Sequence, residues 1–183
     1  MKEKPILFNG EMVRAILDGR KTMTRRAVKP QPTLDHGLVF EGIALGKFGA
    51  VSDSVIACPY GTIGDRLWVK ETHHVRDAGY VDGTGRDIVY KADDEDFPYG
   101  WTPSIHMPRW ASRITLEITN VRVERLHEIT EADAEREGVE PWSSNALDFN
   151  GYYNSFSHLW DSTTKDHKWE SNPWVWVIEF KRI

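Results

Sequence analysis

Alternating apolar and polar residues mark the strands of this chain most clearly near its middle and its end. Over residues 114–119, Ile114, Leu116 and Ile118 alternate with polar residues, as a half-buried strand requires, and we predict a strand over 114–123. A second alternation over residues 174–180 places four large apolar side chains on one face: Trp174, Trp176, Ile178 and Phe180. Because so much aromatic bulk needs a full core, we expect this last strand to lie centrally.

Weaker patterns predict four further strands. Ile6-Leu7-Phe8 indicates a short first strand, and residues 66–71 alternate with Leu67 and Val69 on one face. Shorter strands are predicted at 38–40 and 88–90, within Gly-, Asp- and Pro-rich stretches.

Three helices follow from spacing and capping residues. Asn9 is a good N-cap for a helix over 10–18, and Gly19 stands where a C-terminal glycine belongs. Thr130 with Asp133 forms a capping-box pattern for a second helix, which Gly138 should end. Tyr152, Phe156, Leu159 and Trp160 indicate a third helix over about 152–161. Residues 20–26 should leave the first helix as a loop or an extended segment.

These elements predict an α+β fold, a small antiparallel β-barrel with short flanking helices and turn-rich loop insertions. The chain has 183 residues, 40% of them hydrophobic and 28% charged, which suits one globular domain. We find no internal repeat, no heptad pattern and no interdomain linker.

Composition excludes several classes of site. The single cysteine, Cys58, rules out an internal disulfide and a cysteine-based zinc cluster. The seven histidines contain no helical i, i+4 pair, so we expect no metal site. We see no phosphate loop, no dinucleotide-binding fingerprint and no Gly-x-Ser-x-Gly elbow, and expect no cofactor. Without a signal peptide or an apolar run of about 18 residues, we expect a cytoplasmic protein with no membrane partner.

Charge is distributed unevenly. The net charge of −5 argues against a general nucleic-acid binder, yet one short segment is strongly basic: Arg14, Arg20, Lys21, Arg25, Arg26 and Lys29. This segment is either a solvated surface patch or a local site for one phosphate or one nucleotide.

The basic segment contains a motif. Gly19-Arg20-Lys21-Thr22-Met23-Thr24-Arg25-Arg26 resembles the Gly-x-Lys-x-x-Glu-x-Arg pattern of ASCH domains, in the PUA-like superfamily. Gly19, Lys21 and Arg26 match the pattern, and Thr24 replaces its Glu. The bacterial N4-acetylcytidine amidohydrolases of this family also carry Thr at that position.

The resemblance extends in order along the whole chain, through Gly64-Asp65-Arg66-Leu67, residues 130–137 and residues 177–181. It implies one ASCH domain over 1–183, with insertions near 30–60, 75–110 and 140–172. These make the chain similar to the longer ASCH proteins of phages and prophages. The implied fold is a PUA-like barrel with a cleft for a nucleobase, and the implied partners are a modified nucleoside or single-stranded RNA.

The resemblance also implies a catalytic set of Lys21, Thr24 and Glu137. Thr24 would attack the acyl group of an N-acylated cytosine, and Lys21, three residues away, would take its proton if burial lowered its pKa sufficiently. Glu137 would transfer a proton or orient Lys21, although a neighbouring carboxylate raises a lysine pKa. Lys21 could instead stay charged and stabilise the oxyanion, with water as the nucleophile. The alternative for all three residues is a surface charge or a local cap.

Five residues are candidates for substrate binding: Arg20, Arg26, Glu71, Arg109 and Trp110. Arg26 could clamp a phosphate or carboxylate through its planar fork, or form a structural ion pair. Arg109 and Trp110 lie in a rigid basic segment that suits the lip of a cleft or an ordinary loop. Glu71 and His73 would share one face of a strand, as part of the site or as a satisfied polar pair.

We therefore expect an amidohydrolase acting on an N-acylated cytidine or a related modified nucleoside. A non-enzymatic RNA or modified-base reader and a ribonuclease remain as alternatives. An interaction protein in phage assembly is not favoured by any feature of the sequence.

Overall fold

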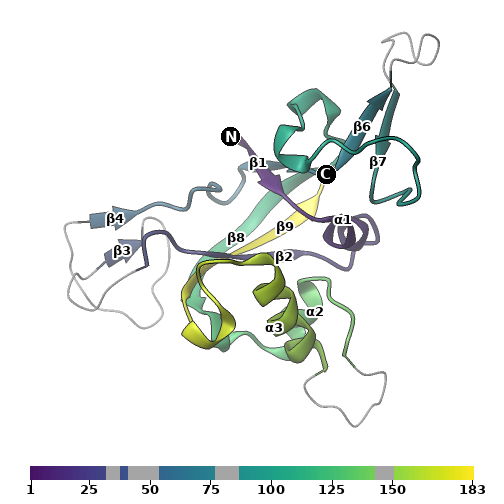
Figure 1. Cartoon of the computed structure of the whole chain (residues 1–183). Helices are drawn as coiled ribbons and strands as arrows, with labels where there is room; N and C mark the ends of the chain where they lie inside the picture. The colour runs from purple at the N-terminus through teal and green to yellow at the C-terminus, as the bar shows by residue number, and fades with distance from the viewer. Residues whose placement is uncertain (32–37, 41–53, 77–86, 143–150) are drawn as a thin grey trace.

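The structure is a computed structural model that describes residues 1–31, 38–40, 54–76, 87–142 and 151–183 (Figure 1). Its helices and strands are, in chain order, β1 (Glu3–Leu7), α1 (Gly10–Leu17), β2 (Met23–Ala27), β3 (Leu38–Phe40), β4 (Ser54–Ile56), β5 (Arg66–Lys70), β6 (His73–Arg76), β7 (Asp87–Tyr90), β8 (Thr115–Arg125), α2 (Glu131–Arg136), α3 (Gly151–Thr163) and β9 (Trp174–Arg182). Short 3₁₀ turns lie at Ser104–His106, Arg109–Ala111, Leu126–Glu128 and Trp169–Ser171. The α+β prediction is confirmed.

One five-stranded sheet carries the fold, in the order β1-β5-β8-β9-β2. The long strands β8 and β9 pair antiparallel across its middle, so the prediction that the last strand lies centrally is confirmed. β1 and β5 pair in parallel, and the prediction of a purely antiparallel sheet was wrong there. Among the described residues, pairing leaves β1 and β2 as the two edges of the sheet, so the predicted small barrel is not detected as a closed sheet.

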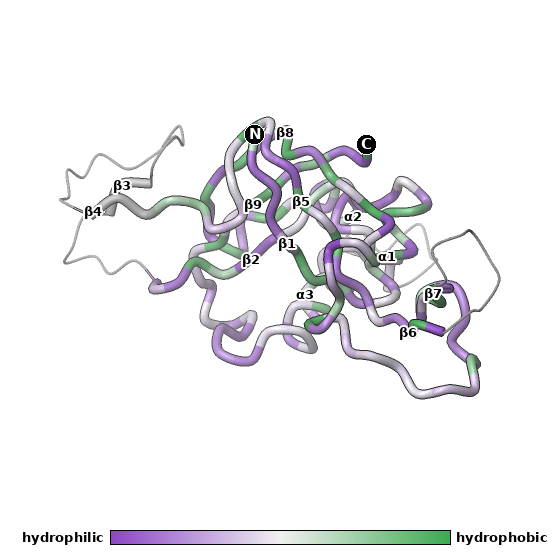
Figure 2. Tube along the Cα trace, turned by 90° about the horizontal axis from the view of Figure 1, so that it is seen from above, coloured by the Kyte–Doolittle hydropathy of each residue, from purple (hydrophilic) through white to green (hydrophobic). Residues whose placement is uncertain are grey.

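Two smaller strand pairs lie apart from this sheet. β3 pairs with β4 in parallel, and β6 pairs with β7 antiparallel. Figures 1 and 2 both show these pairs extending away from the main sheet on opposite sides. Residues 32–37 and 41–53, in the first predicted insertion, lie outside the described residues, as do 77–86 and 143–150.

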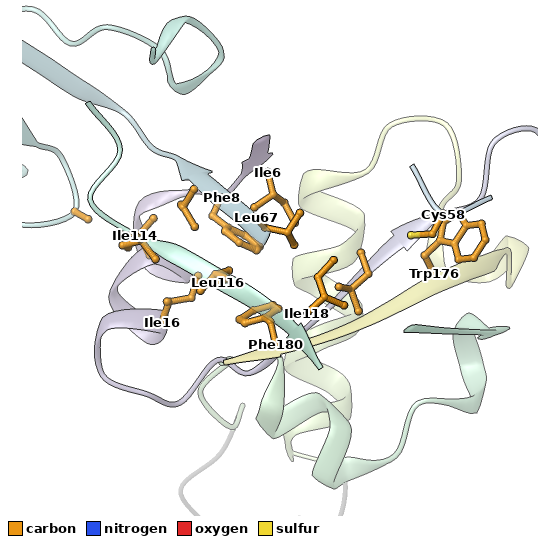
Figure 3. Packing of buried hydrophobic residues seen from close by; sticks show 14 of the residues in the cluster. Ile6, Phe8, Ile16, Cys58, Leu67, Ile114, Leu116, Ile118, Trp176 and Phe180 are labelled. Atoms are coloured by element: carbon orange, nitrogen blue, oxygen red, sulfur yellow. The ribbon is translucent and has the colours of Figure 1, made fainter. Parts of the chain in front are cut away.

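Both faces of β9 are buried, because the sheet separates two hydrophobic cores. Trp176, Ile178 and Phe180 face the core shared with β1, α1, β5 and β8, whereas Val175 and Val177 face the core shared with α2 and α3. Figure 3 shows the first core, with side chains from α1, β1, β5, β8 and β9 gathered on one face. In Figure 2, which colours each residue by its hydropathy, hydrophobic and hydrophilic stretches alternate along the chain.

The helix ends agree with the capping predictions. The Asn9 side chain accepts a hydrogen bond from the Met12 backbone N–H at 2.8 Å, and the Thr130 hydroxyl accepts one from the Asp133 N–H at 3.1 Å. Gly19 and Gly138 both have positive φ, 77° and 83°, where the chain leaves α1 and α2. No helix among the described residues is long and apolar enough to cross a bilayer.

Candidate active site

Lys21 is brought into the protein by the turn that ends α1. Gly19 adopts the left-handed conformation there, and the Lys21 backbone N–H then donates to the Ala15 carbonyl at 2.9 Å. The next N–H, of Thr22, donates to the Arg136 carbonyl at 2.9 Å. These bonds fix the chain between α1 and β2, so Lys21 points inward and is only 2% exposed.

Glu137 comes to the same place as the C-cap residue of α2. Lys21 Nζ donates to the Glu137 carboxylate at 2.8 Å and to its backbone carbonyl at 2.7 Å. Glu137 is also 2% exposed, so this is a fully buried ion pair. A Cβ at Gly138 would stand 2.8 Å from the Cβ of Lys21, and only a glycine permits this close approach.

Opposing influences act on the Lys21 ammonium. Desolvation lowers its pKa, Glu137 raises it through charge and hydrogen bonding, and the cations of Arg26 and Arg25 lower it again. The net direction is a lowered pKa. The Lys21 Nζ also lies 5.5 Å from the centre of the Phe8 ring, within cation–π range.

Thr24 lies on β2, the edge strand beside β9, opposite Ile178. Because the segment is extended from Met23, the three-residue spacing does not place Thr24 beside Lys21 as a helical turn would. Thr24 is 2% exposed, and it lines a small cavity of about 50 Å³ together with Glu137. Of the three predicted catalytic residues, the structure thus joins Lys21 to Glu137 directly and Thr24 to Glu137 across this cavity.

Arg25 is a buried charge in this site that the sequence analysis did not single out. It lies on the opposite face of β2 from Thr24, opposite Val177, and its side chain is fully buried. Its guanidinium contacts three acids: Glu124, Asp133 at 3.1 Å and Glu137 at 3.4 Å. Its Nε is buried with no hydrogen-bond partner among the described residues. Because the acids lie 99 to 112 positions further along the chain, no local pattern could have revealed the cluster.

Arg26 continues the alternation of β2 on the Thr24 face, opposite Trp176. Its guanidinium donates to the Leu7 carbonyl at 2.7 Å and lies 5.3 Å from the centre of the Phe8 ring. Arg26 also lines the small cavity. It therefore links the two edges of the sheet and borders the site at the same time.

Helix α3, which belongs to the last predicted insertion, forms one wall of this site. Phe156, Leu159, Trp160 and Thr163 line the small cavity from α3, and Met12 lines it from α1. A larger groove of about 600 Å³ adjoins it between α1 and α3, and both spaces are bordered by Met12, Glu137 and Leu159.

The other predicted binding residues do not line the small cavity. Arg20 borders the large groove, paired with Asp18 at 3.2 Å and Glu140 at 2.8 Å. Arg109 pairs with Glu3 at 3.1 Å and lies over the Trp68 ring, and Trp110 is 52% exposed in the same 3₁₀ turn. These contacts fit the alternative of an ordinary loop packed on the sheet.

Glu71 is buried and follows β5, where Arg113 holds it through Nε at 2.9 Å and Nη2 at 3.0 Å. Burial raises the pKa of Glu71, and the Arg113 hydrogen bonds and charge oppose this rise. His73 is buried next to it, with Nδ1 3.2 Å from the Glu71 carbonyl. The Glu71 carboxylate thus pairs with Arg113 and not with the His73 side chain, which contacts only the Glu71 backbone carbonyl.

The described part of the chain contains no group of three or more His, Cys, Asp or Glu side chains that could hold a metal ion. The polar groups of the candidate site are instead two cations, Lys21 and Arg25, with the carboxylate of Glu137 between them.

No protein-family model and no curated protein matches the sequence. Among solved structures, the chain is similar to an ASCH domain from Lactobacillus crispatus JV V101, with a TM-score of 0.43 and 13% sequence identity over 99% of this chain and 79% of that one. It is also similar to a protein of the DUF984 family from Enterococcus faecalis V583, with a TM-score of 0.44 and 11% identity over 100% of this chain and 81% of that one.

Proposed function

We propose that this chain is an ASCH-type domain with a PUA-like fold, and that it hydrolyses the acyl amide of a modified nucleoside such as N4-acetylcytidine. The observation that carries the proposal is the buried Lys21–Glu137 pair at 2.8 Å, because Glu137 and Thr24 line the same small cavity. Buried ion pairs are costly to form, so a pair that faces a cavity suits a functional role better than a stabilising one.

Amide hydrolysis needs a nucleophile, a base and a proton for the leaving amine. In the proposed reaction the Thr24 hydroxyl, or a water held by it, attacks the acyl carbon, and the Glu137 carboxylate accepts the proton released. The same proton then passes to N4 of cytosine as the C–N bond breaks, which leaves cytidine. If Thr24 itself is acylated, a water then hydrolyses the ester, so the net reaction consumes one water and releases one carboxylic acid.

Lys21 acts in this scheme through Glu137. Its ammonium donates to one oxygen of the carboxylate at 2.8 Å, and the guanidinium of Arg25 donates to the other oxygen at 3.4 Å. Lys21 and Arg25 thus place two positive charges beside the carboxylate that would accept the proton.

The charges around the large groove argue against a polyanion as the main ligand. Arg14 pairs with Glu95 at 2.8 Å, and Arg20 pairs with Asp18 and Glu140. Cations already neutralised by acids contribute little to phosphate binding. A nucleoside therefore fits this groove better than an RNA strand.

The direct test is incubation of the purified protein with N4-acetylcytidine, with cytidine release followed by chromatography. We expect Thr24→Ala and Glu137→Gln each to lower kcat/KM by at least about 100-fold, as loss of a nucleophile or a general acid–base does. Thr22→Ala is the matched control, because Thr22 lies two residues away outside the lining of the small cavity, and should keep full activity.

Full activity in Thr24→Ala would disprove the attack by Thr24, and full activity in Glu137→Gln would disprove the proton transfer. If the wild-type protein releases no cytidine but binds the nucleoside, the chain is a modified-base reader. Salt-dependent binding of single-stranded RNA with no such release would instead support the RNA-reader alternative.

A further inference from the structure

The two spaces that meet at Glu137 differ greatly in size. The one beside Thr24 measures about 50 Å³, and the groove between α1 and α3 measures about 600 Å³. An apolar cavity of roughly 150 Å³ accommodates a six-membered ring such as benzene. The space beside Thr24 is therefore too small for a pyrimidine, but it has room for an acetyl group. The groove is within the range of ordinary small-molecule sites, about 300–1,000 Å³.

The lining of the small cavity suits an acyl group. Met12, Phe156, Leu159 and Trp160 supply apolar surface for a methyl group. The edge of β2 supplies a polar atom. The Thr22 carbonyl and the Val28 N–H point toward β9, since Phe180 N–H donates to Thr22 O and Val28 N–H donates to Trp174 O, both at 2.9 Å.

In an antiparallel ladder these orientations alternate, so the backbone N–H of Arg25 points away from β9. Arg25 lines the small cavity, and a backbone N–H at such a position is a suitable donor to a developing oxyanion. The cavity thus combines an apolar lining for the acyl methyl group with a donor for the acyl oxygen.

The large groove offers a different chemistry. Ser155, His158 and Ser162 recur at helical spacing along the face of α3 that borders the groove, next to Leu159. Hydroxyl and imidazole groups both donate and accept hydrogen bonds, which suits the hydroxyls of a sugar. Leu159 borders both spaces and therefore stands at the passage between them.

We propose that the substrate binds with its acyl group inserted into the cavity beside Thr24, while its base and sugar lie in the groove between α1 and α3. Leu159 then determines specificity, because it limits the size of the acyl group. This inference rests on the proposed hydrolase function and adds the substrate class: small N-acyl groups on a nucleoside, with the sugar recognised by α3.

The test compares N4-acetylcytidine with N4-benzoylcytidine on the wild-type protein and two leucine variants. Wild type should favour the acetyl compound in kcat/KM by about 100-fold, because the benzoyl ring exceeds the cavity. Leu159→Ala should reduce that ratio about tenfold by enlarging the passage. Leu17→Ala is the matched control on α1, lining neither space, and should leave the ratio unchanged. Equal rates on both compounds, or an unchanged ratio in Leu159→Ala, would overturn the inference while leaving the hydrolase function intact.

The groove is tested separately with Ser162→Trp, which fills it from an exposed position. This change should raise KM for N4-acetylcytidine about tenfold and affect the sugar-free N4-acetylcytosine much less. Asn154→Trp, exposed on α3 and outside the groove lining, is the control and should change neither value. Equal effects of Ser162→Trp on both compounds would contradict sugar recognition in the groove.

If none of these compounds is hydrolysed, the proposed function fails, and calorimetric Kd values for the same compounds decide the inference. Tighter binding of the acetyl compound, with a smaller preference in Leu159→Ala, would support the binding orientation without catalysis. Kd values that do not depend on the size of the acyl group, or no binding of any compound, would overturn the proposed binding orientation as well.

Discussion

Lys21 and Glu137 form an ion pair in which each residue depends on the other. Both side chains are essentially inaccessible to water, and each is placed by a bend that follows a helix. Removing one partner leaves a buried charge, which costs far more than the net contribution of the pair. The pair therefore makes this part of the protein sensitive to single substitutions.

We expect Lys21→Met to lower the free energy of unfolding by about 3 kcal/mol, because Glu137 would keep only Arg25, at 3.4 Å. Glu137→Gln should lower the free energy of unfolding by a similar amount, since Lys21 would lose its carboxylate partner. The double variant should lose clearly less than the sum of the two, as expected when two residues share one interaction. Urea denaturation of all four proteins measures this, and additive losses would show that the pair is not coupled.

Asp65 gives a residue-scale prediction for pH. Its carboxylate accepts hydrogen bonds from the backbone N–H groups of Lys2 at 2.7 Å and Thr62 at 3.2 Å. The bond from Lys2, followed by that from Thr62, lowers the pKa of Asp65 below its ordinary value of 3.8. A depressed carboxyl pKa stabilises the folded state above the unfolded pKa, and this contribution disappears as the pH falls through the folded value.

Stability of the wild-type protein should thus decrease below about pH 4, and Asp65→Asn should flatten the decrease. Thermal melts of both proteins over this range measure the difference. Parallel pH curves for the two proteins would show that Asp65 does not contribute.

At the scale of elements, the glycines after α1 and α2 differ in what surrounds them. Gly19 and Gly138 have nearly the same positive φ, but nothing lies within 4 Å of a Cβ built on Gly19. A Cβ on Gly138 would meet the Cβ atoms of Ala15 and Lys21, both at 2.8 Å. The end of α2 therefore depends on glycine for conformation and for its close packing on the Lys21 segment.

Gly19→Ala should lower the free energy of unfolding by about 1 kcal/mol, the penalty for a side chain in the left-handed region. Gly138→Ala should lower it by at least about 1 kcal/mol more, since the added methyl group also pushes α2 away from Lys21. Because Glu137 precedes Gly138, the second variant alone should lose hydrolysis of N4-acetylcytidine. Equal stability and equal activity in the two variants would contradict the close-packing argument.

Over the whole molecule, β9 joins the two cores. Trp176 is buried in the core with β1, α1, β5 and β8, and the adjacent Val177 is buried in the core with α2 and α3. A strand shared in this way couples the folding of both halves. The candidate site lies at the outer edge of β2, which β9 supports along its other edge.

We expect Trp176→Ala to lower stability by about 3–5 kcal/mol and Val177→Ala by about 2 kcal/mol. Each variant should still unfold in one transition, because neither core is complete without β9. Coincident melting curves by circular dichroism and tryptophan fluorescence would support this coupling. Two separate transitions would show that the cores fold independently.

The elements of this protein were largely determined by local sequence. Asn9 and Thr130 start their helices through side-chain bonds within three residues, and Gly19 and Gly138 end them, so neighbouring positions sufficed for prediction. The alternation in 114–119 and 174–180 likewise marks faces of strands without reference to the rest of the chain. The motif at 19–26 indicated Lys21 and Thr24 as candidate site residues through its resemblance to the ASCH pattern.

Tertiary structure alone decided which faces and charges meet. Hydrophobic periodicity shows that a face is buried but not against what, so the parallel pairing of β1 with β5 and the position of α3 over β2 were not predicted. The acids around Arg25 and the Arg113 partner of Glu71 lie far away in sequence. Such contacts form only when packing brings distant segments together, and the same packing sets the small cavity beside Thr24 and the groove beyond it.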